Sequence, residues 1–253
     1  MWHPALFRSA ERLLNTLAPC YCILCGLPSK RALSLCRACE DEIPPNIPAC
    51  PRCALPLREA APECGHCLRR PPAFAATIAP RLYTEPMPQF IKSLKFRGDL
   101  SLLPVLTELM AAAIASRLEQ RRAPDVLIPM PLHWFRRWRR GFNQAELLAR
   151  SLSLHPRLRS ACLSVDSSLC RRRRATRPQH GLDAKSRRRN LRNAIECTAP
   201  IDGLCLAIID DVMTTGASAD ALAGVLLKAG AAEVEVWCCA RTPNPAADSA
   251  IRG

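Results

Sequence analysis

The sequence predicts a mixed α/β protein in which a small cysteine-rich module precedes a parallel sheet. Nine of the fifteen cysteines lie between Cys20 and Cys67. After about residue 72 the density of cysteine and proline falls, and short apolar runs alternate with segments of helical periodicity. Strands that are apolar throughout are buried on both faces, so this alternation indicates parallel strands covered by helices.

Residues 1–19 are expected to form an amphipathic helix of their own. Apolar side chains such as Leu6 and Leu13 recur near helical spacing, but Arg8 and Glu11 interrupt them. The segment therefore does not resemble a secretory signal. No stretch approaches the roughly 20 apolar residues that a membrane span needs. We expect a soluble, cytoplasmic protein without a membrane span.

Residues 20–72 are expected to form a double metal-binding module. Four C-x-x-C pairs follow one another, and ten residues separate the two pairs within each half. Each pair presents two thiolates to one centre, and two pairs complete the tetrahedral shell that zinc accepts. The expected ligands are Cys22, Cys25, Cys36, Cys39, Cys50, Cys53, Cys64 and Cys67. We therefore expect one or two structural Zn²⁺ ions.

Two alternatives stay open for this module. The equal gaps favour sequential pairing, in which each half closes its own site, over a crossed pairing. The same ligands also permit an iron–sulfur cluster. The segment has many prolines and few large aliphatic residues, so metal ligation would supply its folding free energy. Cys20 and His66 are expected not to be ligands.

Residues 73–253 are expected to form the sheet domain. The short apolar runs predict strands, and the longer periodic segments predict helices. In chain order these are a strand at 77–83, helices at 88–96 and 101–120, a strand at 126–132, a helix at 143–154, a strand at 204–210, a helix at 218–230 and a strand at 233–241. Asn143 is a candidate N-cap of the helix that follows it.

Residues 204–218, LCLAIIDDVMTTGAS, carry the strongest functional signal. The apolar run ends at Asp210 and Asp211, and the loop Thr214, Thr215, Gly216, Ala217 and Ser218 leads into a helix. Ligands of parallel sheets bind beyond the carboxyl ends of the strands. Loop N–H groups, hydroxyls and the positive helix end suit a monophosphate. The two carboxylates would repel it, but they can accept hydrogen bonds from vicinal hydroxyls. The segment predicts a ribose-5-phosphate site.

Positive charge is concentrated in the middle of the chain. Residues 133–192 hold 17 Lys and Arg against three acids, which equals the formal net charge of +14 of the whole chain. Such a local field favours polyanions, either a phosphorylated small molecule or a nucleic acid. A solvated surface run is the alternative interpretation.

The 204–218 pattern resembles the PRPP-binding motif of type I phosphoribosyltransferases, and the wider chain resembles the ComF family, also called GntX-like or competence protein F. Further stretches carry the likeness: the cysteine pairs, IKSLKFRGD at 91–99, IPMPLHWFRRWRRGFNQAELLA at 128–149, and the array from Arg174 to Asn190. The resemblance implies a Rossmann-like parallel sheet of the type I phosphoribosyltransferase kind, with a basic insertion, the hood, at about 160–195.

The resemblance also implies roles for particular residues. Asp210 and Asp211 would be the catalytic residues that bind the ribose hydroxyls, and Thr214 to Ser218 would bind the 5-phosphate of PRPP, with Mg²⁺ sharing its charge. The pyrophosphate loop would comprise Pro131, Leu132 and His133, with Arg139 and Arg140 facing phosphate. The hood, also the expected nucleic-acid surface, would use Arg171, Arg172, Arg173, Arg174, Thr176, Gln179, Arg187 and Asn190. Purine-salvage relatives have an acid where this chain has Thr214, which disfavours hypoxanthine or guanine as acceptor.

Two functional hypotheses result. The first is a ComF-like phosphoribosyltransferase, a glycosyltransferase that transfers a pentosyl group to an unidentified acceptor and is linked to DNA uptake in natural transformation. The second is a single-stranded DNA-binding competence or recombination factor in which the PRPP site is regulatory or inactive. Trp134, Phe135 and Trp138 alternate with arginines, which suits stacking on unpaired bases; packing against the cysteine module is the alternative. Other competence or recombination proteins are expected partners.

Overall fold

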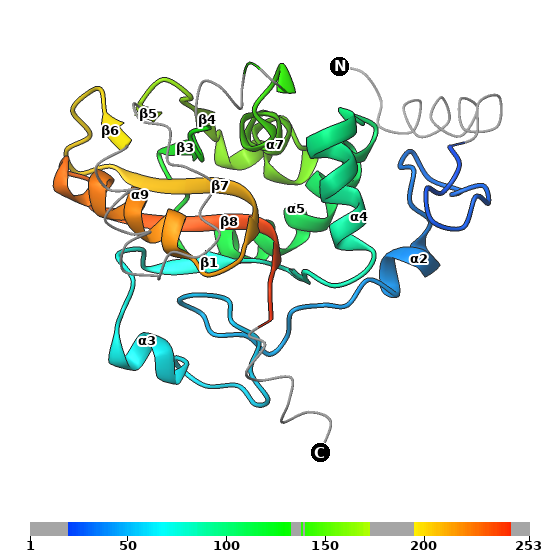
Figure 1. The fold of residues 1–253 in the computed structure, drawn as a ribbon, viewed down its shortest axis with the longest axis horizontal. Coiled ribbons are helices and arrows are strands. Elements are labelled where there is room, and N and C mark those ends of the chain that lie inside the picture. Colours follow the sequence, from blue (N-terminus) through cyan, green and yellow to red (C-terminus); the bar gives the residue numbers. More distant parts are fainter. Residues whose placement is uncertain (1–19, 133–137, 139, 173–194, 244–253) are drawn as a thin grey trace.

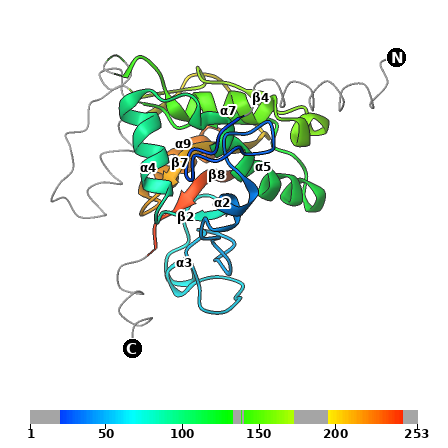
Figure 2. The same ribbon diagram turned by 90° about the vertical axis from the view of Figure 1, so that its right-hand side faces the viewer.

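The computed structural model describes residues 20–132, 138, 140–172 and 195–243, and the expected helix at 1–19 lies outside them (Figures 1 and 2). The helical elements are α2 (Arg37–Asp41), α3 (Gly65–Arg69), α4 (Met87–Lys92), η1 (Ser93–Arg97), α5 (Leu102–Gln120), α7 (Gln144–Ser153), η2 (Pro156–Ala161) and α9 (Ala217–Lys228). The strands are β1 (Ala76–Ile78), β2 (Arg81–Leu82), β3 (Val126–Pro129), β4 (Ser164–Val165), β5 (Cys170–Arg172), β6 (Ile195–Cys197), β7 (Cys205–Met213) and β8 (Glu233–Arg241).

The main sheet is parallel, as predicted. Its strand order is β1-β8-β7-β3-β4, and β2 also pairs with β8. The central strand β7 places Ile208 opposite Ile128 of β3 and Val236 of β8. The single strand expected at 77–83 is two short strands, β1 and β2, that both run along β8. The two-residue strand β4 and the antiparallel pair β5–β6 are too short to give a periodic signal and were not predicted.

Helices cover both faces of the sheet. Because successive strand residues point to opposite faces, Ile209 and Trp237 join one core with α5 and α7, whereas Ile208 and Val236 join a second core with α9. Figure 1 shows α9 on one side of β7 and β8 and α5 on the other. Within the part of the chain that the structure describes, no helix is both long enough and apolar enough to cross a membrane.

The two halves of the cysteine module pack on different faces of the sheet. In the first half, Leu35 and Ile43 are fully buried in the core that contains α5 and α7. In the second half, Ala54 and the thiols of Cys53 and Cys67 belong to the core that contains α9. Each half of the cysteine module therefore packs against a different face of the sheet.

Asn143 caps α7 and also holds it to the end of β3. Its side chain accepts a hydrogen bond from Ala145 N (3.1 Å) and donates one to the Met130 carbonyl (3.2 Å). Replacing Asn143 by Ala is expected to lower the free energy of unfolding by about 1–2 kcal/mol, because both bonds are lost at a buried position. Urea denaturation measures this change.

The control is Arg150→Ala, which removes an exposed ion pair with Glu146 (2.9 Å) on the same helix. Its expected cost is only about 0.3–0.5 kcal/mol. Equal losses for the two variants would show that the cap does not anchor α7.

Candidate functional site

The order of the strands creates a crevice between β3 and β7. The chain leaves β3 through α7 and returns to the sheet as β4 on one side, whereas it leaves β7 through α9 and returns as β8 on the other side. The two connections thus diverge between β3 and β7. In open parallel sheets, ligands bind beyond the carboxyl ends of the strands at this switch point.

A pocket of about 350 Å³ lies at that place. It is lined by Tyr83, Lys95, Met130, Pro131, Leu132, Arg140, Gln144, Ala145, Ile195, Asp210, Asp211, Val212, Thr214 and Ser218. The lining includes both predicted acids, two loop residues and three residues of the expected pyrophosphate side. Tyr83 and Lys95 had no predicted role, although Lys95 lies in the stretch IKSLKFRGD that carries the family likeness. Gln144 belongs to the stretch at 128–149 that was expected to face phosphate through Arg139 and Arg140, and Ile195 lies at the end of the expected hood.

The acid pair lies inside the strand and not after it, because β7 continues to Met213. Asp211 is only 2% exposed, and its Oδ2 lies 2.7 Å from Lys95 Nζ. Asp211 N also donates a hydrogen bond to Asp210 Oδ1 (2.9 Å). Lys95 reaches the pocket from η1, a π-helical turn, and such turns are frequent at functional sites. The ion pair compensates part of the cost of burying the Asp211 carboxylate.

The surroundings of Asp210 raise the pKa of its carboxyl group. Burial and the neighbouring Asp211 carboxylate raise the pKa of Asp210 to about 7, against the opposing effect of Lys95. Near neutral pH the carboxyl group of Asp210 is thus close to its titration midpoint.

This raised pKa predicts a pH-dependent stability of the free protein. Folded Asp210 keeps its proton to about pH 7, whereas the unfolded side chain loses it near its usual value of 3.8. The folded state then binds more protons than the unfolded state, so the free energy of unfolding should fall as the pH rises across this window. Urea denaturation of wild type and Asp210→Asn between pH 4 and pH 8 tests this. A wild-type pH profile identical to that of the variant would contradict it.

The loop after β7 has the form of an anion cradle. Gly216 adopts a left-handed conformation (φ +75°) and precedes the first turn of α9, where Ala217 N donates to Thr215 Oγ1 (3.3 Å). A small hollow of about 50 Å³ is enclosed by the loop and lined by all five predicted residues, from Thr214 to Ser218. A glycine at this position lets the backbone turn without strain, and the start of a helix attracts negative charge.

Several predicted site residues lie outside the described residues. These are His133, Arg139, Arg173, Arg174, Thr176, Gln179, Arg187 and Asn190, together with Trp134 and Phe135. Of the expected hood at 160–195, the described part contains β4, β5 and the first residue of β6. Arg171 lies exposed on β5, and Ile195 of β6 contributes to the wall of the pocket.

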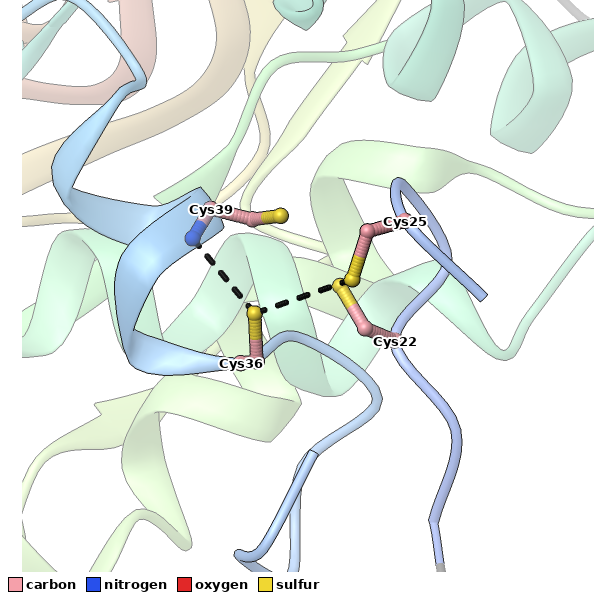
Figure 3. A group of neighbouring side chains, drawn as sticks. All are labelled: Cys22, Cys25, Cys36 and Cys39. Atoms are coloured by element: carbon pink, nitrogen blue, oxygen red, sulfur yellow. Dashed lines mark hydrogen bonds between the residues drawn. The ribbon is translucent and has the colours of Figure 1, made fainter. Parts of the chain in front are cut away.

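The eight expected cysteine ligands form two groups, as sequential pairing requires. In each group the four Sγ atoms lie within 4.8 Å of one another. The first group contains Cys22, Cys25, Cys36 and Cys39, whose side chains converge in Figure 3. The second contains Cys50, Cys53, Cys64 and Cys67.

The spacing within both groups fits a tetrahedral metal site. The Cys25 and Cys36 sulfurs are 3.9 Å apart, and those of Cys53 and Cys64 are 3.6 Å apart. Four thiolates at about 2.3 Å from a zinc ion require separations close to these values. Backbone N–H groups point at the sulfurs, as between Cys64 N and Cys50 Sγ (3.3 Å), which stabilises thiolates. Cys20 and His66 are in neither group.

Comparison with known proteins assigns the chain to a family. Residues 13–68 match the family model of the double zinc ribbon domain. The chain is 37% identical to DNA utilization protein YhgH of Salmonella typhimurium, over 88% of this chain and 98% of that protein. It is 34% identical to competence protein F of Haemophilus influenzae, over 82% of this chain and 90% of that protein. The chain belongs to the ComF family.

Membership of the ComF family confirms the resemblance seen in the sequence, and the zinc ribbon match agrees with the two thiolate groups. Among solved structures, the chain is similar to a purine phosphoribosyltransferase from Pyrococcus horikoshii. The identity is 18%, the match covers 54% of this chain and 73% of that one, and the TM-score is 0.33.

Proposed function

We propose that this ComF-family protein binds PRPP together with Mg²⁺ and transfers its pentosyl group to an acceptor. One observation carries the proposal: Asp210 and Asp211 line one pocket at the β3–β7 switch point together with Thr214 and Ser218, the two ends of a loop that turns at the left-handed Gly216. A ribose diol needs hydrogen-bond acceptors, and a phosphate needs N–H donors at a helix start. The pocket offers both at adjacent positions of β7 and its loop.

The charges around the pocket suit the chemistry of PRPP. Asp210 and Asp211 would hold the two ribose hydroxyls, and Lys95 would orient the Asp211 side chain through their 2.7 Å contact. Arg140 lines the same pocket, as do Pro131 and Leu132 of the expected pyrophosphate loop. A cation at that position would stabilise the negative charge that develops on a leaving pyrophosphate. Bound Mg²⁺ would supply further charge neutralisation.

We further propose that each thiolate group holds one structural Zn²⁺. The cysteine-rich part would comprise residues 20–72 and the transferase domain residues 73–253. The protein would work in the cytoplasm. A reducing compartment keeps the eight ligand thiols available for metal.

Titration calorimetry with PRPP and Mg²⁺ tests the proposal, combined with an assay for released pyrophosphate. The protein is incubated with PRPP alone, with single-stranded DNA and with cell extract. Saturable, Mg²⁺-dependent binding supports the assigned pocket, and pyrophosphate release that needs an added acceptor supports transfer. Absence of PRPP binding at millimolar ligand would refute the proposal.

Single-stranded DNA binding is a second candidate function, which one surface feature favours. Phe96 is 73% exposed, and the guanidinium of Arg140, which lines the pocket, lies 5.2 Å from the centre of its ring. Exposed aromatic rings beside cations stack on unpaired bases. The relatives named DNA utilization protein and competence protein F make a DNA-uptake context plausible.

For this candidate, Phe96→Ala is expected to weaken binding of a single-stranded oligonucleotide about tenfold, because one stacking contact is worth roughly 1–3 kcal/mol. Replacing Arg171 to Arg174 by Ala should instead reduce the dependence of affinity on salt, since phosphate contacts release counterions. Fluorescence anisotropy at several salt concentrations measures both effects. The control is Leu154→Ala, which removes another exposed apolar side chain (73%). If neither test variant differs from the control, this function is excluded.

A further inference from the structure

The second thiolate group lies next to the loop of the candidate phosphate site, and a buried arginine joins them. Arg241, at the end of β8, is 6% exposed. Its Nε donates to the carbonyl of Cys53 (3.0 Å), a member of that thiolate group. Its Nη1 donates to the carbonyls of Met213 (3.1 Å) and Thr214, where the loop begins. One guanidinium thus binds both the second thiolate group and the first residues of the loop.

A second connection reaches the other end of the loop. Ala73, six residues after Cys67 of the second thiolate group, donates a hydrogen bond from its backbone N to Asp220 Oδ1 (2.8 Å), in the first turn of α9. The next residue, Phe74, lies 3.9 Å from the position that a Cβ atom at Gly216 would occupy. Hydrogen bonds therefore connect the second thiolate group to the residues before the loop and to the residues after it.

A cavity lies beside these hydrogen bonds. A cavity of about 460 Å³ lies between the second thiolate group and the loop, lined by residues of both, including Cys67, Phe74 and Thr215. Beside the cavity, Cys67, Phe74 and Met213 pack in one core, and the hydrogen bonds of Arg241 and Asp220 add directional contacts to this packing. The first thiolate group packs on the opposite face of the sheet, in the core of α5.

The contacts of Arg241 also help to orient the loop backbone: the Met213 carbonyl accepts from Thr242 N (3.0 Å) as well, and Arg241 adds a bond to it and one to the Thr214 carbonyl. In a trans peptide the carbonyl and the following N–H point in opposite directions. Because the carbonyls of Met213 and Thr214 face Arg241, the N–H groups of Thr214 and Thr215 point away from it. Those are the donors that an anion in the loop would need.

We propose that metal occupancy of the second thiolate group controls the ligand affinity of the loop, with Arg241 as the positioning residue. Ligation fixes the backbone of Cys53, Cys53 orients the guanidinium, and the guanidinium turns the loop carbonyls away from the ligand. This inference rests on the proposed binding of PRPP. Its linkage is reciprocal, so PRPP must strengthen metal binding at the second group by the same factor.

The reciprocal effect can be measured within one molecule. The zinc-loaded wild-type protein is equilibrated with a chelator, with and without PRPP and Mg²⁺, and the freed thiols are alkylated and located by mass spectrometry. PRPP is expected to protect Cys50, Cys53, Cys64 and Cys67 by about tenfold in chelator concentration, a typical coupling. The first group, Cys22 to Cys39, serves as the internal control and should be unaffected.

A matched pair of variants tests the role of Arg241. Arg241→Gln should keep both metals but bind PRPP about tenfold more weakly and lose the protection by PRPP. The control is Arg81→Gln, because Arg81 also donates to a backbone carbonyl, that of Ile43 (2.7 Å), in the stretch between the two thiolate groups. It should bind PRPP within about twofold of wild type.

The outcomes separate the two ideas. If the wild type binds PRPP but protection is equal for both thiolate groups, or Arg241→Gln binds as tightly as Arg81→Gln, the coupling is refuted while the proposed function stands. If the wild type binds no PRPP, both are refuted. Cobalt substitution gives an independent readout, because PRPP should change the visible spectrum of thiolate-bound Co²⁺ in the wild type and leave it unchanged in Arg241→Gln.

Discussion

Replacing Asp210 and Asp211 together by Asn is expected to weaken PRPP binding at least about 100-fold. Each carboxylate would accept a charge-assisted hydrogen bond from a ribose hydroxyl, and such a bond contributes about 1.5–3 kcal/mol. The loss of two therefore amounts to about 3 kcal/mol or more, and each 1.4 kcal/mol is a factor of ten in affinity. The amides keep the shape of the pocket, so the loss reports charge and acceptor strength.

Titration calorimetry with PRPP and Mg²⁺ measures the effect. Asp202→Asn is the matched control, since Asp202 is an exposed acid on the turn just before β7. Single variants divide the contributions: Asp211→Asn also leaves Lys95 without its 2.7 Å partner in the pocket, and that free cation can partly offset the loss by attracting phosphate. Unchanged affinity in the double variant would remove the basis of the proposed site.

Removing the metals is expected to have the largest effect on stability. Structural zinc bound by thiolates contributes on the order of 10 kcal/mol per site, comparable to the whole stability of an ordinary domain. Strong chelation should therefore unfold the cysteine-rich part. Because its two halves lie in different cores, both faces of the sheet should lose packing as well.

Metal analysis should find two zinc ions per chain, and heating with and without chelator should give widely separated unfolding transitions. Cys162→Ser is the control, since Cys162 is exposed and lies in neither thiolate group; it should change stability by less than about 0.5 kcal/mol. A chelator-treated chain that unfolds like the loaded one would show that ligation does not hold the fold. A brown, iron-containing protein would identify the cluster alternative.

Much of the fold was predictable because its signals are local. The apolar runs that became β3, β7 and β8 are continuous in sequence; β3 lies between α5 and α7, and α9 separates β7 from β8. The cysteine spacing led to the two groups of four ligands. Asn143 was recognisable as a cap because capping depends on the next few residues. The acids and the loop adjoin one another in the chain, so the meeting of Asp210 and Asp211 with Thr214 and Ser218 in one pocket needed no long-range information.

The sequence alone thus predicted the parallel sheet, the sets of cysteine ligands and the loop for which we propose anion binding, all of which depend on neighbouring residues. The tertiary structure decided which distant residues complete them. Lys95 meets Asp211, and Arg241 meets Cys53, 188 positions earlier in the chain. It also placed the two thiolate groups on opposite faces of the sheet. Periodicity records which face of an element is buried, but the partner of a buried charge depends on how the whole chain packs.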